Sequence, residues 1–276
     1  MTHRKPREER FASPNRRGRS LRASERMEIL VSEPFDDPED GFGLQQAVLE
    51  EIAAGERGAI ALIWTSSRYI GATRKETRLP GFAAATEAAF ESGFPVLVRN
   101  SGGGAVAANG GSLSFSLTFP VEDLRHGLYE RYSEGLGLIA SALRRVGVEA
   151  ERGEVEGEFC PGAYSVRSGG PRGVKHAGLA QRVTRRAARL EALVLVSQTD
   201  EVRAVLERFY GLLALPFRPG SVGDLPADVP RVIRALSEEV RGRYTARLGR
   251  IGETTMDRAR ALRGEWRVIP GTGSSL

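Results

Sequence analysis

The alternation of apolar and polar positions predicts where this chain forms strands and helices. Over residues 113–119, Leu or Phe alternates with Ser or Thr, which predicts a strand with one buried face. The continuous apolar run 59–64 predicts a strand buried on both faces. Residues 44–52 carry apolar side chains at helical spacing and predict an amphipathic helix that ends near Gly55. Similar patterns predict strands at 27–31, 94–99, 163–167, 174–182 and 190–196, and helices at 80–92, 128–143, 202–213 and 229–244.

The order of these elements predicts one folded domain between two tails. Hairpin-like pairs of strands flanked by helices are typical of an α+β (α/β) fold, here with a mixed, mainly antiparallel sheet. We expect this domain over residues 28–250, because no internal repeat or second boundary interrupts it. Residues 1–27 are rich in Arg, Ser and Pro and are expected to be a basic disordered tail. Residues 251–276 are expected to form a frayed C-terminal tail.

The net charge of +5 comes from the N-terminal tail. Residues 1–26 hold eight Arg and one Lys against three Glu, a net charge of +6, so the other 250 residues carry −1. The folded part therefore does not indicate a nucleic-acid partner, although the tail leaves contact with RNA, a membrane or a protein open. An apolar segment long enough for a membrane helix or a signal peptide is not present in the sequence. We expect a cytoplasmic protein that binds no nucleic acid and no membrane.

Two residue counts limit the chemistry of the chain. One cysteine excludes an internal disulfide framework, and one cysteine with three histidines gives no zinc-type cluster. Of the 40 basic residues, only Lys5, Lys75 and Lys175 are lysines. A lysine retained against such an excess of arginine indicates a role for a compact ammonium, and Lys175 is the one that lies between apolar segments.

A glycine-rich loop is the first candidate for a binding element. Arg99 and Ser101 precede the glycines 102–104, and the loop lies between two predicted strands. Consecutive glycines allow positive φ and let backbone N–H groups approach a ligand closely. A flexible hairpin is the alternative interpretation. A nucleotide P-loop is disfavoured, because Gly-Lys-Ser/Thr does not follow.

Cys160 is the candidate nucleophile. It lies in the turn Gly-Glu-Phe-Cys-Pro-Gly of residues 157–162, and reactive groups are often found on such exposed turns. Lys175 follows 15 residues later, so a hairpin can bring the two together, and a nearby ammonium favours thiolate over thiol. The alternative is an inert, buried cysteine. His176 points to the opposite face of its strand from Lys175 and is expected to be structural.

Two motifs together resemble a known family. They are Arg-Asn-Ser-Gly-Gly-Gly-Ala-Val at 99–106 and Lys-His-Ala-Gly-Leu-Ala-Gln-Arg at 175–182. The first is similar to the acyl-binding signature, and the second to the lysine segment, of the lipoate and biotin protein ligase superfamily. The resemblance covers roughly residues 28–250 and implies the ligase-type catalytic domain. It implies the substrate-binding residues Arg99, Ser101, Gly102, Gly103, Gly104, Ala105, Gly178, Ala180 and Gln181, and the catalytic residues Cys160 and Lys175.

Departures from the family pattern favour one branch of the superfamily. Ala107 and Ala108 stand where ATP-using ligases usually carry a histidine. In octanoyltransferases of the carrier-protein class the cysteine lies on a later strand, whereas here Cys160 precedes the lysine segment. This order resembles the branch that moves octanoyl groups from the glycine cleavage H protein to other proteins. The resemblance implies that Cys160 takes the octanoyl group as a thioester and passes it to lipoyl-domain lysines of 2-oxoacid dehydrogenase E2 subunits. It further implies that Lys175 activates the thiol and that the glycine loop lines the acyl tunnel.

The same resemblance implies no metal, nucleotide or other cofactor, and we expect a monomer. Three alternatives remain open from the sequence. The first is an octanoyl-carrier-protein:protein octanoyltransferase, which differs only in its donor. The second is an ATP-dependent lipoate-protein ligase, which would act without Cys160. The third is a non-catalytic acyl-domain scaffold, in which Cys160 and Lys175 are both replaceable.

Overall fold

The structure is a computed structural model that describes residues 26–122 and 127–270. The expected basic tail lies outside the described residues except for its last two positions, which belong to the first strand. The strands are β1 (Arg26–Val31), β2 (Ala59–Trp64), β3 (Tyr69–Ala72), β4 (Val96–Val98), β5 (Val106–Ala108), β6 (Ser112–Pro120), β7 (Glu151–Arg152), β8 (Ser165–Ser168), β9 (Val174–Val183), β10 (Ala187–Leu195) and β11 (Thr245–Leu248). The helices are α1 (Pro38–Ala54), α2 (Phe82–Glu91), α3 (Leu128–Arg145), α4 (Thr199–Leu212), α5 (Val229–Arg243) and α6 (Glu253–Ala261), with short 3₁₀ turns η2 (Glu76–Arg78), η3 (Gly170–Arg172) and η4 (Pro219–Ser221).

A mixed sheet of eight strands forms the centre of the molecule, in the order β11-β1-β2-β6-β10-β9-β8-β7. β1 pairs in parallel with both β2 and β11, whereas the five other neighbouring pairs are antiparallel. This confirms the predicted mixed, mainly antiparallel sheet. A second sheet, in the order β4-β3-β5, is smaller and includes two strands, β3 and β5, that the hydrophobic pattern did not predict.

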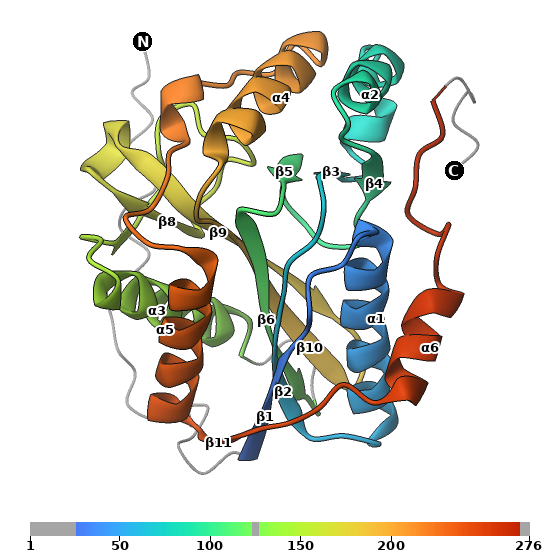
Figure 1. Cartoon of the computed structure of the whole chain (residues 1–276), viewed down its shortest axis with the longest axis vertical. Coiled ribbons are helices and arrows are strands. Elements are labelled where there is room, and N and C mark those ends of the chain that lie inside the picture. The colour runs from blue at the N-terminus through green and yellow to red at the C-terminus, as the bar shows by residue number, and fades with distance from the viewer. Residues whose placement is uncertain (1–25, 123–126, 271–276) are drawn as a thin grey trace, which may run out of the picture.

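Helices cover the sheets in three pairs (Figure 1). α1 and α6 pack together, α3 packs on α5, and α2 packs on α4 beside the small sheet. Each pair encloses a separate group of buried apolar side chains. Burial of apolar surface between these layers is the main force that holds the fold together.

Both faces of the central strand β6 are buried. Its Leu and Phe side chains pack in the core shared with α3 and α5, as the alternating pattern predicted. Its polar face is also covered, because α1 contacts β6, and Ser116 and Thr118 are only 2% and 0% exposed. The prediction of one buried face was therefore incomplete.

The expectation of a frayed tail beyond residue 250 is wrong for the described part of that segment. Residues 253–261 form α6, which packs against α1. Gly43 makes this close approach possible, since a Cβ on it would lie 2.3 Å from the backbone O of Ala259. The chain then runs beside β4, where the Val98 N–H donates to the Trp266 carbonyl at 2.7 Å, and the Trp266 side chain is buried.

Among the described residues, no helix combines the length and the apolar composition that crossing a bilayer requires.

Candidate active site

Cys160 is positioned by an irregular turn between β7 and β8, where its side chain is half-buried. Its φ of +44° lies in the left-handed region, which residues other than glycine rarely adopt. Sγ accepts a hydrogen bond from the Gly104 N–H at 3.0 Å, and the Arg99 Nη2 lies 3.8 Å from it. One amide N–H and one guanidinium therefore face the sulfur.

The glycine loop packs directly against this cysteine. Arg99 follows β4 and holds the loop from inside, with Nη1 donating to Ser101 Oγ at 2.9 Å and Nη2 to the Gly104 carbonyl at 2.6 Å. Gly103 has φ of +102°, and a Cβ on it would lie 2.6 Å from Cys160 Sγ. Glycine is thus required at this position both by the backbone conformation and by the sulfur. The glycine loop and the cysteine turn, which the sequence analysis identified separately, therefore form one site.

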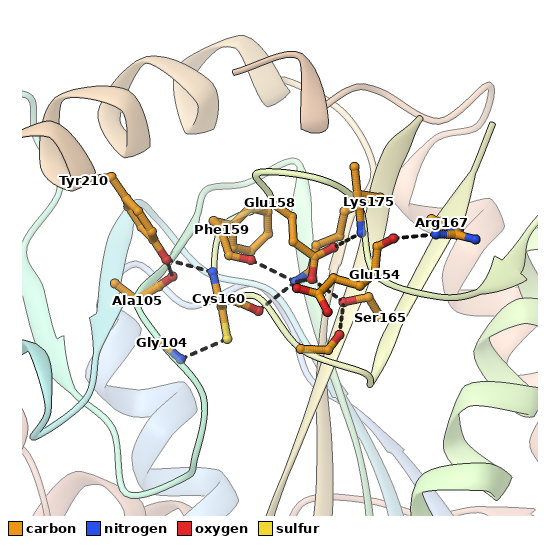
Figure 2. A network of polar contacts seen from close by, with 12 residues as sticks. Gly104, Ala105, Glu154, Glu158, Phe159, Cys160, Ser165, Arg167, Lys175 and Tyr210 are labelled. Atoms are coloured by element: carbon orange, nitrogen blue, oxygen red, sulfur yellow. Dashed lines mark hydrogen bonds and ion pairs between the residues drawn. The ribbon is translucent and has the colours of Figure 1, made fainter. Parts of the chain in front are cut away.

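Lys175 lies on β9 and is buried in a complete network of oxygen acceptors (Figure 2). Its Nζ donates to Glu158 Oε1 at 2.9 Å, to the Phe159 carbonyl at 2.9 Å and to the Cys160 carbonyl at 3.1 Å. The side chains of Lys175 and Glu158 are 1% and 0% exposed. The carboxylate of Glu158 also accepts from Ser165 Oγ at 2.6 Å and from the Val155 N–H at 2.9 Å.

The structure brings Lys175 to the cysteine turn, as the sequence predicted, but at a different part of the turn. All three ammonium donors of Lys175 go to oxygens of residues 158–160, whereas the hydrogen-bond donors at the sulfur come from Gly104 and Arg99. A buried ion pair is stable only when its remaining donors and acceptors are satisfied, and here they are. Lys175 therefore fixes the backbone of the turn that carries Cys160.

Tyr210, on α4, is a member of the site that the sequence analysis missed. Its hydroxyl accepts from the Cys160 N–H at 2.7 Å and donates to the Ala105 carbonyl at 2.7 Å (Figure 2). Burial raises the pKa of Tyr210 above its ordinary value, so the hydroxyl stays protonated and can make both bonds. A tyrosine on the apolar face of a predicted helix was the available signal, because a buried tyrosine hydroxyl needs a partner.

A cavity of about 80 Å³ lies beside the glycine loop. Arg99 lines this cavity, and its Nη2 also lies 3.8 Å from the sulfur of Cys160, so the cysteine lies beside the cavity. Small residues, Gly178 and Ala180, form part of the wall on β9. The remaining wall combines aromatic, aliphatic and polar side chains, and its members include Phe42, Gln45, Trp64, Tyr69, Ser101, Val106, Ser114, Arg189, Glu191, Leu193 and Trp266.

A half-buried carboxylate, Glu191, faces two arginines in this cavity. Arg189 Nε donates to it at 2.8 Å, and Arg99 Nη1 lies 3.8 Å from its other oxygen. Burial acts to raise the pKa of Glu191, but the charges of Arg189 and Arg99 and a hydrogen bond with Ser101 outweigh burial and lower it. The carboxylate is therefore ionised and faces Nη1 of Arg99, whereas Nη2 of the same guanidinium faces the sulfur of Cys160.

The other residues that the sequence analysis named do not all lie at the cavity. Gly102 is exposed at the tip of the loop, and Ala105 is buried with its carbonyl bound by Tyr210. Gln181 is not part of the cavity wall, because its side chain accepts from Arg131 Nε at 2.8 Å and donates to the Leu128 carbonyl at the start of α3.

His176 is buried and shares a hydrogen bond with Ser168 Oγ at 2.8 Å, as a structural residue would. Burial lowers its pKa to about 4. Over the described part of the chain, no group of three or more His, Cys, Asp or Glu side chains is arranged to hold a metal ion.

Comparison with known proteins identifies the family of this chain. Residues 37–245 match the lipoyl protein ligase A/B catalytic domain. The Octanoyl-[GcvH]:protein N-octanoyltransferase of Geobacillus kaustophilus is 31% identical over 211 residues, which cover 74% of this chain and 71% of that protein. The protein of the same name from Bacillus velezensis is 31% identical over 214 residues, covering 75% and 72%.

Solved structures share the fold at lower identity. A putative lipoate protein ligase from T. acidophilum with bound lipoic acid superimposes with a TM-score of 0.67 and 18% identity, covering 88% of this chain and 95% of that chain. A lipoate-protein ligase A bound with ATP gives a TM-score of 0.67 and 19% identity, covering 87% and 94%.

The chain belongs to the lipoyl protein ligase A/B catalytic domain family. This confirms the resemblance found in the sequence. The names of the curated relatives confirm the expected enzyme class, an acyltransferase that moves octanoyl groups in protein lipoylation.

Proposed function

We propose that this protein transfers an octanoyl group from the glycine cleavage H protein to lipoyl-domain lysines of 2-oxoacid dehydrogenase E2 subunits, through a thioester on Cys160. The observation that carries the proposal is the position of the sulfur, which faces the Gly104 N–H at 3.0 Å and the Arg99 guanidinium at 3.8 Å beside the cavity. The names of the curated relatives, octanoyl-[GcvH]:protein N-octanoyltransferase, support the H protein as donor.

The chemistry needs two acyl transfers at one sulfur. In the first, the Cys160 thiolate attacks the amide carbonyl of an octanoylated lysine, the C–S bond forms and the C–N bond breaks. The donor lysine leaves as a free amine after taking up the proton that the thiol lost. In the second, the amine of the acceptor lysine attacks the thioester, the C–N bond forms and the C–S bond breaks, and the released sulfur takes up the proton that the amine loses. Because an amide is more stable than a thioester, the first transfer runs uphill and the second draws it forward.

The residues around Cys160 have separate roles in this proposal. Gly104 and Arg99 stabilise negative charge on the sulfur, and Lys175 holds the cysteine turn through its carbonyls. The aromatic and small side chains of the cavity would take the octanoyl chain. Neither a nucleotide nor a metal takes part in either transfer. One chain supplies both the cysteine and the cavity, so we propose that the enzyme acts as a monomer, in the cytoplasm.

Intact-protein mass spectrometry tests this function. The protein is mixed, without ATP, with octanoylated H protein or with octanoyl-carrier protein, and Cys160→Ala serves as the control. We expect a hydroxylamine-labile octanoyl adduct from the H protein, which is lost in the control. Transfer to a lipoyl domain should then remove the adduct and octanoylate the domain.

Other outcomes would overturn the proposal in defined ways. An adduct from the carrier protein alone would show that the donor is the acyl carrier. Lipoyl-domain acylation that needs ATP and survives Cys160→Ala would show a lipoate-protein ligase. Absence of any acyl transfer under these conditions would favour a non-catalytic scaffold.

A further inference from the structure

Tyr210 joins the two loops that make the site. Its hydroxyl lies between the Cys160 N–H and the Ala105 carbonyl, at 2.7 Å from each, and the tyrosine is 2% exposed (Figure 2). The residue comes from α4, near the end of that helix, and belongs to neither sequence motif. The contact therefore ties a helix, the glycine loop and the cysteine turn together at one atom.

The backbone of Cys160 needs such support. A φ of +44° is sparsely populated for a residue with a Cβ and persists only when the surrounding structure holds it. Lys175 holds the carbonyl side of Cys160 at 3.1 Å, and Tyr210 holds the amide side. With both ends of the residue fixed, the direction of the Cα–Cβ bond is fixed as well, and the hydrogen bond from the Gly104 N–H to Sγ holds the remaining rotation about that bond.

The same hydroxyl also fixes the donor at the sulfur. Ala105 directly follows Gly104, whose N–H donates to Sγ at 3.0 Å. Tyr210 binds both the Ala105 carbonyl and the Cys160 N–H. It therefore keeps the Gly104 N–H at hydrogen-bonding distance from the sulfur of Cys160. A hydrogen bond that a sulfur anion accepts favours the anion over the thiol, provided that the distance is kept.

We propose that Tyr210 is a positioning residue that sets the contact between Gly104 N–H and Cys160 Sγ and thereby maintains the reactivity of the thiolate. This inference rests on the proposed function in so far as Cys160 is the nucleophile. It adds that the Cys160 N–H, being occupied by Tyr210, is not a donor to the substrate. The Gly104 N–H is then the main-chain donor at the reacting sulfur.

Tyr210→Phe tests this role, because it removes the hydroxyl and keeps the ring. The matched control is Tyr244→Phe, in which a second buried tyrosine, whose hydroxyl lies 3.4 Å from Glu134 Oε1, loses the same atom. The first measurement is the rate of iodoacetamide labelling of Cys160 from pH 6 to 9. We expect Tyr210→Phe to slow labelling about tenfold, because the displaced sulfur would lose the hydrogen bond that it accepts from the Gly104 N–H.

The remaining outcomes are decisive. A labelling profile for Tyr210→Phe that superimposes on that of the wild type would overturn the proposal, and so would an equal change in Tyr244→Phe. A Tyr210→Phe chain that gives no cooperative thermal transition would show that the hydroxyl serves folding instead, and would also overturn it.

Labelling does not depend on the acyl donor. If the wild-type enzyme forms no octanoyl adduct, the proposed function fails while the role of Tyr210 is still tested. If the wild type is acylated but Tyr210→Phe labels normally, only the role of Tyr210 fails.

Discussion

Removing the ammonium of Lys175 is expected to destabilise the protein more than removing an exposed charge would. Lys175→Met keeps the length of the side chain but deprives Glu158 Oε1 of its ion pair and two backbone carbonyls of their donor. The side chain of Glu158 is 0% exposed, so water cannot replace the lost ammonium. Breaking a buried pair from one side costs about 3–5 kcal/mol, which for a chain of this size lowers the melting temperature by about 6–20 °C.

A double-mutant cycle measures the interaction directly. Lys175→Met, Glu158→Gln and the double variant are unfolded in urea, and we expect the double variant to be more stable than the sum of the single changes implies. The control is the exposed pair of Arg172 and Glu156, 3.3 Å apart with side chains 88% and 62% exposed. Arg172→Met should cost less than about 1 kcal/mol. A Lys175→Met variant that is no less stable than Arg172→Met would refute the reasoning.

Two further predictions follow from the site. Gly103→Ala should reduce acylation of Cys160 about 100-fold by displacing the sulfur, because the added Cβ would lie 2.6 Å from it at a φ of +102°. Gly110→Ala, whose Cβ meets no atom within 4 Å, should acylate at the wild-type rate, and equal loss in both variants would contradict the steric argument. Burial lowers the pKa of His176 from 6.5 to about 4, so the unfolded chain binds a proton that the folded chain does not. The stability from this group is complete above pH 6.5 and is lost as the pH falls toward 4, by about 3 kcal/mol in all. In His176→Gln, the midpoint of urea unfolding should depend less on pH over that range. A pH dependence equal to that of the wild type would count against burial as the cause.

The main parts of the site could be predicted from the sequence because each has a local cause. The glycines at 102–104 are required by backbone geometry, and the Pro and Gly around Cys160 indicate an irregular turn. A lysine among so many arginines indicated Lys175. Each of these signals lies within a few residues of the group that it identifies.

The parts that could not be predicted depend on contacts between distant segments. Glu158 looks like a solvated turn residue in sequence, yet it is buried by the pairing of β8 with β9 and by Lys175. Tyr210 looks like an ordinary core residue of an amphipathic helix, and its two bonds connect positions 50 and 105 residues away. The helix α6 buries only Thr255 and Ala259, too few positions for a visible apolar stripe.

The position of Trp266 has a consequence for synthesis of the protein. The part of the chain that matches the family ends at residue 245, yet Trp266, 21 residues later, forms part of the cavity wall. A ribosome makes the chain from its N-terminus, so the glycine loop, Cys160, Lys175 and Tyr210 have all been made before that wall exists. A nascent chain can therefore bring the glycine loop and the cysteine turn together first, and the cavity wall is completed only when Trp266 has been released and packed along β4.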